Sequence, residues 1–194
     1  MLYYFPNRPF LIPPNSPEVI LRDNDPDWHA EIKWMGDRLE LRKIEDKFIF
    51  MNRQKEAFKK FVPSAELLAE LEALNIPNNS QLDGELMHFK TKEIKQTIHF
   101  YDVYVINGNP IYEDLAARRG ILIQHFGGRK FQHVDITEAF PNNFIEIFNK
   151  VIKDHEKEGL VLKDKRGKIQ FTTNKSVDVT WQLKIRKENK NYKF

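Results

Sequence analysis

The order of strand-like and helix-like segments is the sequence feature that most constrains the fold. The segments that favour strands, by apolar alternation between turn residues, are residues 29–51, 81–89, 96–106, 159–173 and 179–186. The segments that favour helices are residues 64–75, 114–126 and 140–159. Because the helices are inserted between groups of strands rather than after every strand, this order predicts an α+β fold of mostly antiparallel sheets with flanking helices.

Local signals set several element boundaries. Ser64 is the expected N-cap of the first helix, which should end before Pro77. Gly159 is expected to stop the third helix, and residues 159–173 to form a hairpin around the turn DKRG. Six prolines in the first 28 residues predict an extended, irregular lead-in over residues 1–28.

Length and composition fit one soluble domain. The chain has 194 residues, 41% of them hydrophobic and 30% charged, and it contains no cysteine, which excludes disulfides, thiol chemistry and cysteine zinc sites. No apolar run approaches the roughly 20 residues of a membrane span, and no basic start marks a signal peptide. We therefore expect a cytoplasmic monomer with no membrane partner, one domain over residues 29–187 and a short basic tail over residues 188–194.

Basic residues gather near the C-terminus. Residues 163–194 hold ten Lys or Arg and three Asp or Glu, although the net charge of the whole chain is only +3. Such a segment could face a phosphate backbone or form a lysine-rich surface in water. Charge alone favours the solvated surface.

Lys33 is the first candidate for chemistry. It lies at the end of an apolar strand, and Gly36 follows three residues later. A lysine that is buried near other cations loses its proton more readily, and the neutral amine is a nucleophile whereas the ammonium is not. A lysine at a strand end is more commonly a solvated edge residue, so this segment alone leaves both interpretations open.

Three further segments place charged groups on or beside strands. Asp83 and Glu85 share a strand face in LDGEL, which suits a bound ligand or a β-bulge with a surface carboxylate. Glu158 precedes an apolar strand in EGLVLKD, which suits a metal ligand near phosphates or a simple helix-to-strand junction. Lys184 and Arg186 share a face in WQLKIR, the spacing of a phosphate clamp.

Taken together, these segments resemble the motifs of the covalent nucleotidyltransferase superfamily of ATP-dependent DNA ligases, RNA ligases and mRNA capping enzymes. The matching segments, in family order, are KWMGDR at 33–38, FIFMNRQKE around Arg53, LDGEL at 82–86, FYDVYVING at 100–108, EGLVLKD at 158–164 and WQLKIR at 181–186. They span residues 29–187, nearly the whole chain. The resemblance implies the nucleotidyltransferase (ATP-grasp-like) fold of a DNA ligase adenylation domain.

The resemblance also implies a role for each matched residue. Lys33 would attack the α-phosphate of ATP to form lysyl-AMP and release pyrophosphate. Glu31 would accept a hydrogen bond from the adenine 6-amino group, which favours ATP over GTP, and Tyr101 would stack on the purine. The other residues expected to bind the nucleotide or nucleic acid are Ile32, Arg38, Arg53, Glu85, Lys184 and Arg186. The expected ligands of Mg²⁺ or Mn²⁺ are Glu85 and Glu158.

The implied reaction transfers AMP to a 5′-phosphate and seals nicks in double-stranded DNA, as in DNA replication and repair. Only eight residues follow Arg186, so we expect no OB-fold domain: the chain acts alone, is a truncation, or depends on a separate OB-fold or accessory subunit. Met35 stands where many DNA ligases have aspartate, and Arg186 stands where the family has lysine.

Three alternatives stay open. An RNA ligase would act on RNA-containing duplexes, although the segments FIFMNRQKE and FYDVYVING favour DNA. A half-module would bind nucleotide and nucleic acid and need a partner for catalysis. A capping-type guanylyltransferase would use GTP, against which Glu31 argues. The six histidines lack metal-ligand spacing and are expected to be packing or surface residues.

Overall fold

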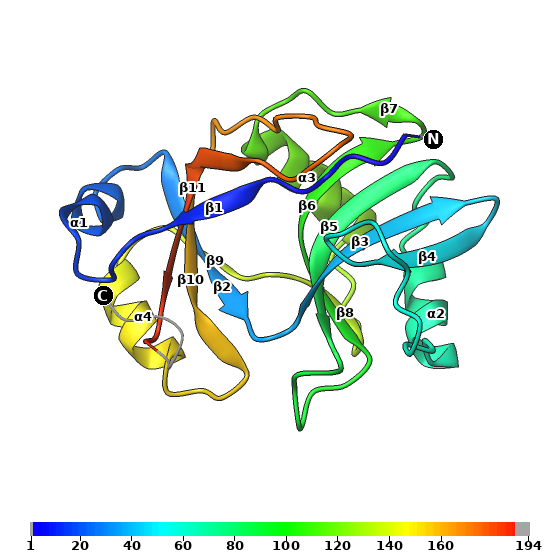
Figure 1. The fold of residues 1–194 in the computed structure, drawn as a ribbon, viewed down its shortest axis with the longest axis horizontal. Coiled ribbons are helices and arrows are strands. Elements are labelled where there is room, and N and C mark those ends of the chain that lie inside the picture. The colour runs from blue at the N-terminus through cyan, green and yellow to red at the C-terminus, as the bar shows by residue number, and fades with distance from the viewer. Residues whose placement is uncertain (1, 189–194) are drawn as a thin grey trace.

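The computed structural model describes residues 2–188 and confirms an α+β fold of mostly antiparallel sheets (Figure 1). The five-stranded sheet consists, in order, of β1 (Arg8–Leu11), β11 (Asp178–Arg186), β10 (Lys157–Asp164), β2 (Trp28–Trp34) and β9 (Ala139–Phe140). The six-stranded sheet consists, in order, of β4 (Lys47–Met51), β3 (Asp37–Ile44), β5 (Ser80–Met87), β6 (Thr97–Ile106) and β7 (Asn109–Pro110), with β8 (Val134–Ile136) also paired to β6. Within the described residues, only the β1–β11 and β6–β8 pairings are parallel.

Each sheet packs two helices against an apolar core of its own (Figure 1). The helices are α1 (Pro17–Asp23) and α4 (Phe144–Val151) on the five-stranded sheet, and α2 (Ala65–Ala73) and α3 (Leu115–Phe126) on the six-stranded sheet. Alternation along β2 sends Ile32 into the core beside α4, and it leaves the charged neighbours Glu31 and Lys33 on the other face. The polar faces of the two sheets can therefore share a site.

Several predicted elements are confirmed. The strands of residues 29–51, 81–89, 96–106 and 179–186 correspond to β2–β4, β5, β6 and β11. The Ser64 hydroxyl accepts a hydrogen bond from the Leu67 backbone N–H at 3.2 Å, so it caps α2 as expected.

Three expectations are wrong. The first 28 residues are not an irregular lead-in, because they contain β1 and α1, and β1 finds its partner in distant β11. The third helix ends at Val151, and Gly159 lies instead within β10. Residues 159–173 form no hairpin: β10 pairs with β11, and the backbone of Gln170 and Thr172 bonds to the N-terminal segment.

The expected domain over residues 29–187 and the expected basic tail over residues 188–194 stay predictions. Residues 189–194 of the expected basic tail lie outside the described residues. Among residues 2–188, no helix has both the length and the apolar character that crossing a membrane requires.

Candidate active site

A cavity of about 580 Å³ lies between the two sheets. It is lined by every residue predicted for the site: Glu31, Ile32, Lys33, Arg38, Arg53, Glu85, Tyr101, Glu158, Lys184 and Arg186. These residues come from β2, β3, β5, β6, β10, β11 and the turn after β4. Folding thus brings all six motif segments to one cavity.

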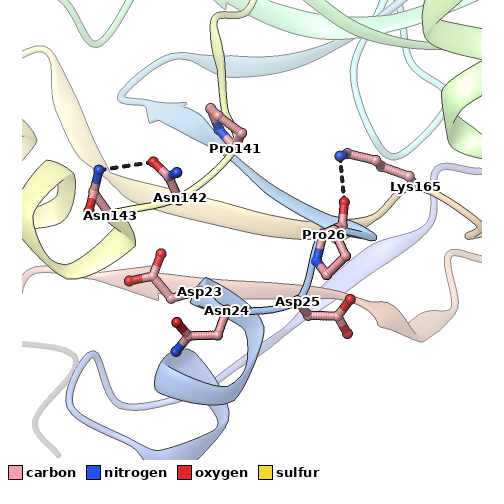
Figure 2. A pocket seen from close by; sticks show the side chains of 8 residues that line it. All are labelled: Asp23, Asn24, Asp25, Pro26, Pro141, Asn142, Asn143 and Lys165. Carbon is pink, nitrogen blue, oxygen red and sulfur yellow. Dashed lines mark hydrogen bonds between the residues drawn. The ribbon is translucent and has the colours of Figure 1, made fainter.

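A second cavity, of about 550 Å³, contains none of these residues (Figure 2). It is lined by Asp23, Asn24, Asp25, Pro26, Pro141, Asn142, Asn143 and Lys165. Lys165 Nζ donates to the Pro26 carbonyl at 2.6 Å, and Asp23 accepts from the Phe144 backbone N–H at 3.0 Å. The side chains of this second cavity therefore tie neighbouring segments together.

Lys33 and Glu158 form the centre of the first cavity. Antiparallel pairing of β2 with β10 puts Lys33 opposite Gly159, and Lys33 Nζ lies 2.5 Å from Glu158 Oε2. Arg186 Nη1 lies 3.8 Å from the same carboxylate oxygen. Because the two paired side chains remain 22% and 24% exposed, a ligand in the cavity can reach them.

Glu85 is the second carboxylate of this centre. Burial raises its pKa to about 7, against the opposing effect of Lys33 and Lys90, and the nearby charge of Glu158 raises it further. Gly36 makes room for it, because a Cβ at Gly36 would lie 2.6 Å from Glu85 Cγ. Glu85 therefore sits within the electrostatic reach of the lysine and the other carboxylate.

Two cations on β11 face the same space. Burial lowers the pKa of Lys184, and the positive charges of Lys33 and Arg186 lower it further. Glu158 is the carboxylate that pairs with Lys33 and Arg186, and a bound phosphate would further relieve the repulsion among the three cations. Arg53 lies at the exposed edge of the cavity.

Glu31 lies at the buried end of the cavity. Its Oε2 lies 2.6 Å from Lys163 Nζ, and its Oε1 lies 3.0 Å from Arg119 Nη1 and from His29 Nε2. Burial acts to raise the pKa of Glu31, but Lys163, His29 and Arg119 outweigh it and hold the value at about 2. A carboxylate has about four acceptor positions, so one remains for the expected contact with adenine.

Tyr101 and Arg38 line the wall beside Glu31. The Tyr101 ring centroid lies 4.9 Å from Lys163 Nζ and 5.6 Å from the Arg38 guanidinium carbon. Arg38 forms a two-pronged ion pair with Asp83 and donates to the Asn7 carbonyl at 2.7 Å. The predicted stacking of Tyr101 and the predicted ribose or phosphate contact of Arg38 stay predictions.

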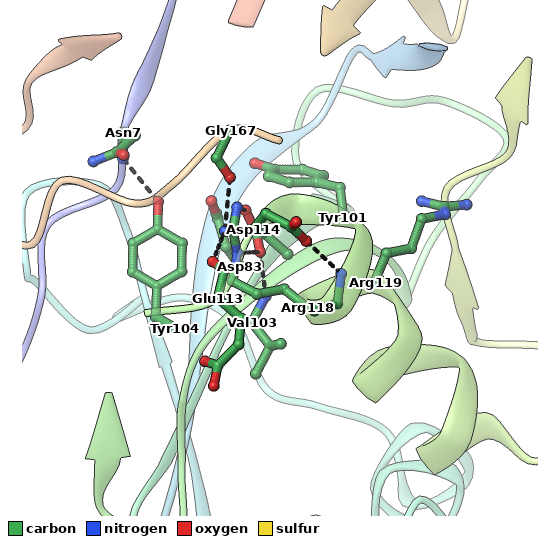
Figure 3. Close-up of polar contacts among 12 residues, drawn as sticks. Asn7, Asp83, Tyr101, Val103, Tyr104, Glu113, Asp114, Arg118, Arg119 and Gly167 are labelled. Atoms are coloured by element: carbon green, nitrogen blue, oxygen red, sulfur yellow. Dashed lines mark hydrogen bonds and ion pairs between the residues drawn. The ribbon is translucent and has the colours of Figure 1, made fainter. Parts of the chain in front are cut away.

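A fully buried arginine supports the strand that carries Tyr101 (Figure 3). Arg118 of α3 donates to both carboxylate oxygens of Asp102, at 2.7 and 3.0 Å, and to the Gly167 carbonyl at 3.0 Å. Figure 3 also shows the Tyr104 hydroxyl, which accepts from the Asn7 backbone N–H at 2.8 Å. Arg118 and Arg119 are not predicted from the sequence, because neither belongs to a motif and no local pattern marks their pairing with Asp102 and Glu31.

The donor set fits a metal that arrives with its substrate. The described residues contain no group of three or more His, Asp or Glu that could hold a metal. Glu85 and Glu158 supply two carboxylates, and Mg²⁺ is usually bound by one or two carboxylates together with substrate phosphates. His29 forms a hydrogen bond with Glu31 and His99 stacks on Trp34, so these two histidines serve hydrogen bonding and packing.

The fold is similar to that of solved ATP-dependent ligases. No family model and no curated protein matches the chain. A mycobacterial DNA ligase D complexed with ATP and MES matches with a TM-score of 0.65 and 17% identity over 93% of this chain and 60% of that chain. An archaeal ATP-dependent RNA ligase matches with a TM-score of 0.57 and 13% identity over 94% of this chain and 48% of that chain. The ATP-dependent DNA ligase from bacteriophage T7, complexed with ATP, matches with a TM-score of 0.53 and 15% identity over 93% of this chain and 69% of that chain.

The chain spans 47–60% of the first ligase structures that it matches. At these identities the likeness concerns the fold. The chain folds as a domain of the ATP-dependent DNA and RNA ligases does.

Proposed function

We propose that this chain is the adenylation domain of an ATP-dependent DNA ligase, which forms lysyl-AMP at Lys33. One observation carries the proposal: a single cavity is lined by the amine of Lys33, the carboxylates of Glu85 and Glu158 and two strand-borne cations, which are the kinds of group that nucleotidyl transfer uses. The ATP-dependent ligases with the same fold support it.

The proposed reaction has three steps. Lys33 Nζ attacks the α-phosphorus of ATP: a P–N bond forms, the P–O bond to pyrophosphate breaks, and the proton on nitrogen passes toward Glu158, its nearest carboxylate. An oxygen of a 5′-phosphate then attacks the same phosphorus, and the P–N bond breaks. The neighbouring 3′-hydroxyl finally gives up its proton to solvent and attacks the 5′-phosphorus: the phosphodiester P–O bond forms, the P–O bond to AMP breaks, and AMP leaves.

The cavity has a surplus of positive charge. Its lining includes eight basic side chains and four acidic ones. In a site partly shielded from water, Lys184 and Arg186 would stabilise the charge that develops on the α-phosphate. A divalent cation on Glu85 and Glu158 would supply further charge neutralisation when bound.

Nicked double-stranded DNA is the proposed partner, and the chain would act as a monomer, alone or with a separate OB-fold or accessory subunit. The RNA alternative has support from the archaeal RNA ligase fold. We therefore treat sealing of RNA-containing duplexes as an outcome of the test.

Intact-mass measurement after incubation with ATP and Mg²⁺ tests the first step. We expect a single AMP adduct with ATP and none with GTP. Nick-sealing assays on all-DNA and RNA-containing duplexes then separate the two substrates. Sealing of RNA ends alone would overturn the DNA assignment, and ATP binding without an adduct would favour the half-module.

A further inference from the structure

Two neighbouring phenylalanines, one of which lines the cavity, lie beside the charged site. Phe58 lines the cavity and packs against the core of the six-stranded sheet, and its ring centroid lies 5.9 Å from that of Phe89. Phe89 is 43% exposed. We call Phe58 and Phe89 the aromatic rim. Phe58 is half-buried and Phe89 is exposed, so the pair presents one open ring beside a charged cavity, which suggests a binding contact.

The loop after β5 holds Phe89 in this exposed position. Lys95 Nζ donates to the His88 carbonyl at 2.5 Å and to the Thr91 carbonyl, which closes the loop on itself. Lys90 Nζ donates to the Gly36 carbonyl at 2.7 Å, which anchors the loop three residues beyond Lys33. The exposure of Phe89 is therefore built into the fold, and the next residue of the loop, Lys90, lines the cavity.

The surface around the aromatic rim is basic. Residues 53–60 and 89–93 contain six exposed Lys or Arg and two Glu. The exposed basic residues are Arg53, Lys55, Lys59, Lys60, Lys90 and Lys92. A phosphate backbone is complementary to this charge, and the faces or edges of bases and sugars are complementary to the two rings.

We infer that the aromatic rim docks the broken end of a nucleic acid duplex, with the rings packed against the base or sugar next to the nick and the surrounding lysines against its phosphates. This inference rests on the proposed function, and it adds the surface that presents a 5′-phosphate to Lys33. Apolar side chains that insert at base steps and aromatic rings that stack on bases are both established modes of contact.

The test compares Phe89→Ala, Phe89→Trp and Tyr112→Ala in binding to a 5′-phosphorylated nicked DNA duplex. Loss of a base–aromatic stack corresponds to about a tenfold weaker affinity for Phe89→Ala, whereas Phe89→Trp should keep near-normal affinity. Tyr112 is the matched control, because it is an aromatic residue that is 67% exposed, contacts the Phe171 ring edge-to-face and does not line the cavity. Tyr112→Ala should bind the duplex normally.

Labelling by ATP in the absence of nucleic acid separates the two proposals. A Phe89→Ala variant that is labelled normally but binds the duplex more weakly supports the inference. Normal duplex binding by Phe89→Ala overturns it and leaves the ligase proposal standing. Equal losses of labelling and binding also overturn it, because Phe89 would then be structural. If the unmodified chain takes no AMP but Phe89→Ala still weakens duplex binding, the ligase proposal fails and the docking surface stands.

Discussion

Lys33 Nζ and Glu158 Oε2 lie 2.5 Å apart, although 125 positions separate the two residues in the chain. The register of β2 against β10 produces this contact, because Lys33 lies opposite Gly159 and Glu158 is its neighbour. Both side chains open to the same cavity, in which Arg186 approaches the same carboxylate. The pair therefore joins a candidate nucleophile to a candidate proton acceptor.

Lys33→Ala should abolish the covalent AMP adduct, because it removes the attacking amine. Lys33→Arg should also abolish it, since a guanidinium keeps its proton and is no nucleophile. Intact mass after incubation with ATP and Mg²⁺ measures the adduct. Lys150→Ala is the control, because Lys150 is an exposed lysine paired with Glu146 on α4. An adduct that persists in Lys33→Ala would refute the assignment of the nucleophile.

Glu158→Gln should slow AMP labelling by at least about 100-fold, because it removes the carboxylate beside Lys33 Nζ. Stability should change little, since a partly exposed ion pair contributes about 1 kcal/mol or less. Labelling kinetics and thermal unfolding measure the two effects. Glu146→Gln, which breaks an exposed pair, is the control. Unfolding of Glu158→Gln with no specific loss of labelling would show that the carboxylate is structural.

Residues on regular strands could be placed from the sequence. The sequence predicts the strand-end position of Lys33 and the strand position of Glu85, and the structure places both side chains in the lining of the cavity. The family resemblance predicts that Glu158 and Lys184 act with those two residues, and the structure places all four in the lining of one cavity.

Contacts between distant segments could not be placed in the same way. Arg119 reaches Glu31 from α3 across 88 positions, and no local pattern marks that pairing. The same reason explains the wrong hairpin, because the partner of β10 is β11 rather than the adjacent residues 165–173. Strand pairing depends on the competition between all exposed edges, which a local turn signal does not contain.

Gly159→Ala should destabilise the chain strongly. The backbone φ of Gly159 is +153°, and a Cβ there would lie 2.1 Å from the Ile185 carbonyl oxygen, so β10 and β11 would have to separate. Gly120→Ala is the matched control, because a Cβ at this position in α3 meets nothing within 4 Å. This substitution should raise the free energy of unfolding by up to about 1 kcal/mol. Urea denaturation measures both. A small effect of Gly159→Ala would contradict the close approach of the strands.

Glu85→Gln should change the pH dependence of stability. Burial raises the pKa of Glu85 from 4.5 to about 7, so the folded chain binds a proton that the unfolded chain has released. Its contribution to the free energy of unfolding is present below about pH 4.5 and is lost as the pH rises through about 7. The melting temperature of Glu85→Gln should therefore rise relative to the unmodified chain across this range, measured with EDTA present. If the melting temperatures of the two proteins changed in parallel with pH, the raised pKa of Glu85 would be contradicted.

Arg118→Met should lower the free energy of unfolding by about 3–5 kcal/mol, because it leaves the buried carboxylate of Asp102 without its cation. Adding Asp102→Asn removes that charge, so the double variant should recover part of the loss. Urea denaturation of the unmodified chain, the two single variants and the double variant gives the four free energies of unfolding that a double-mutant cycle needs. Additive losses would mean that Arg118 acts chiefly through its bonds to the Gly167 and Glu113 carbonyls. A recovery would establish that charge pairing between α3 and β6 supports the strand that carries Tyr101.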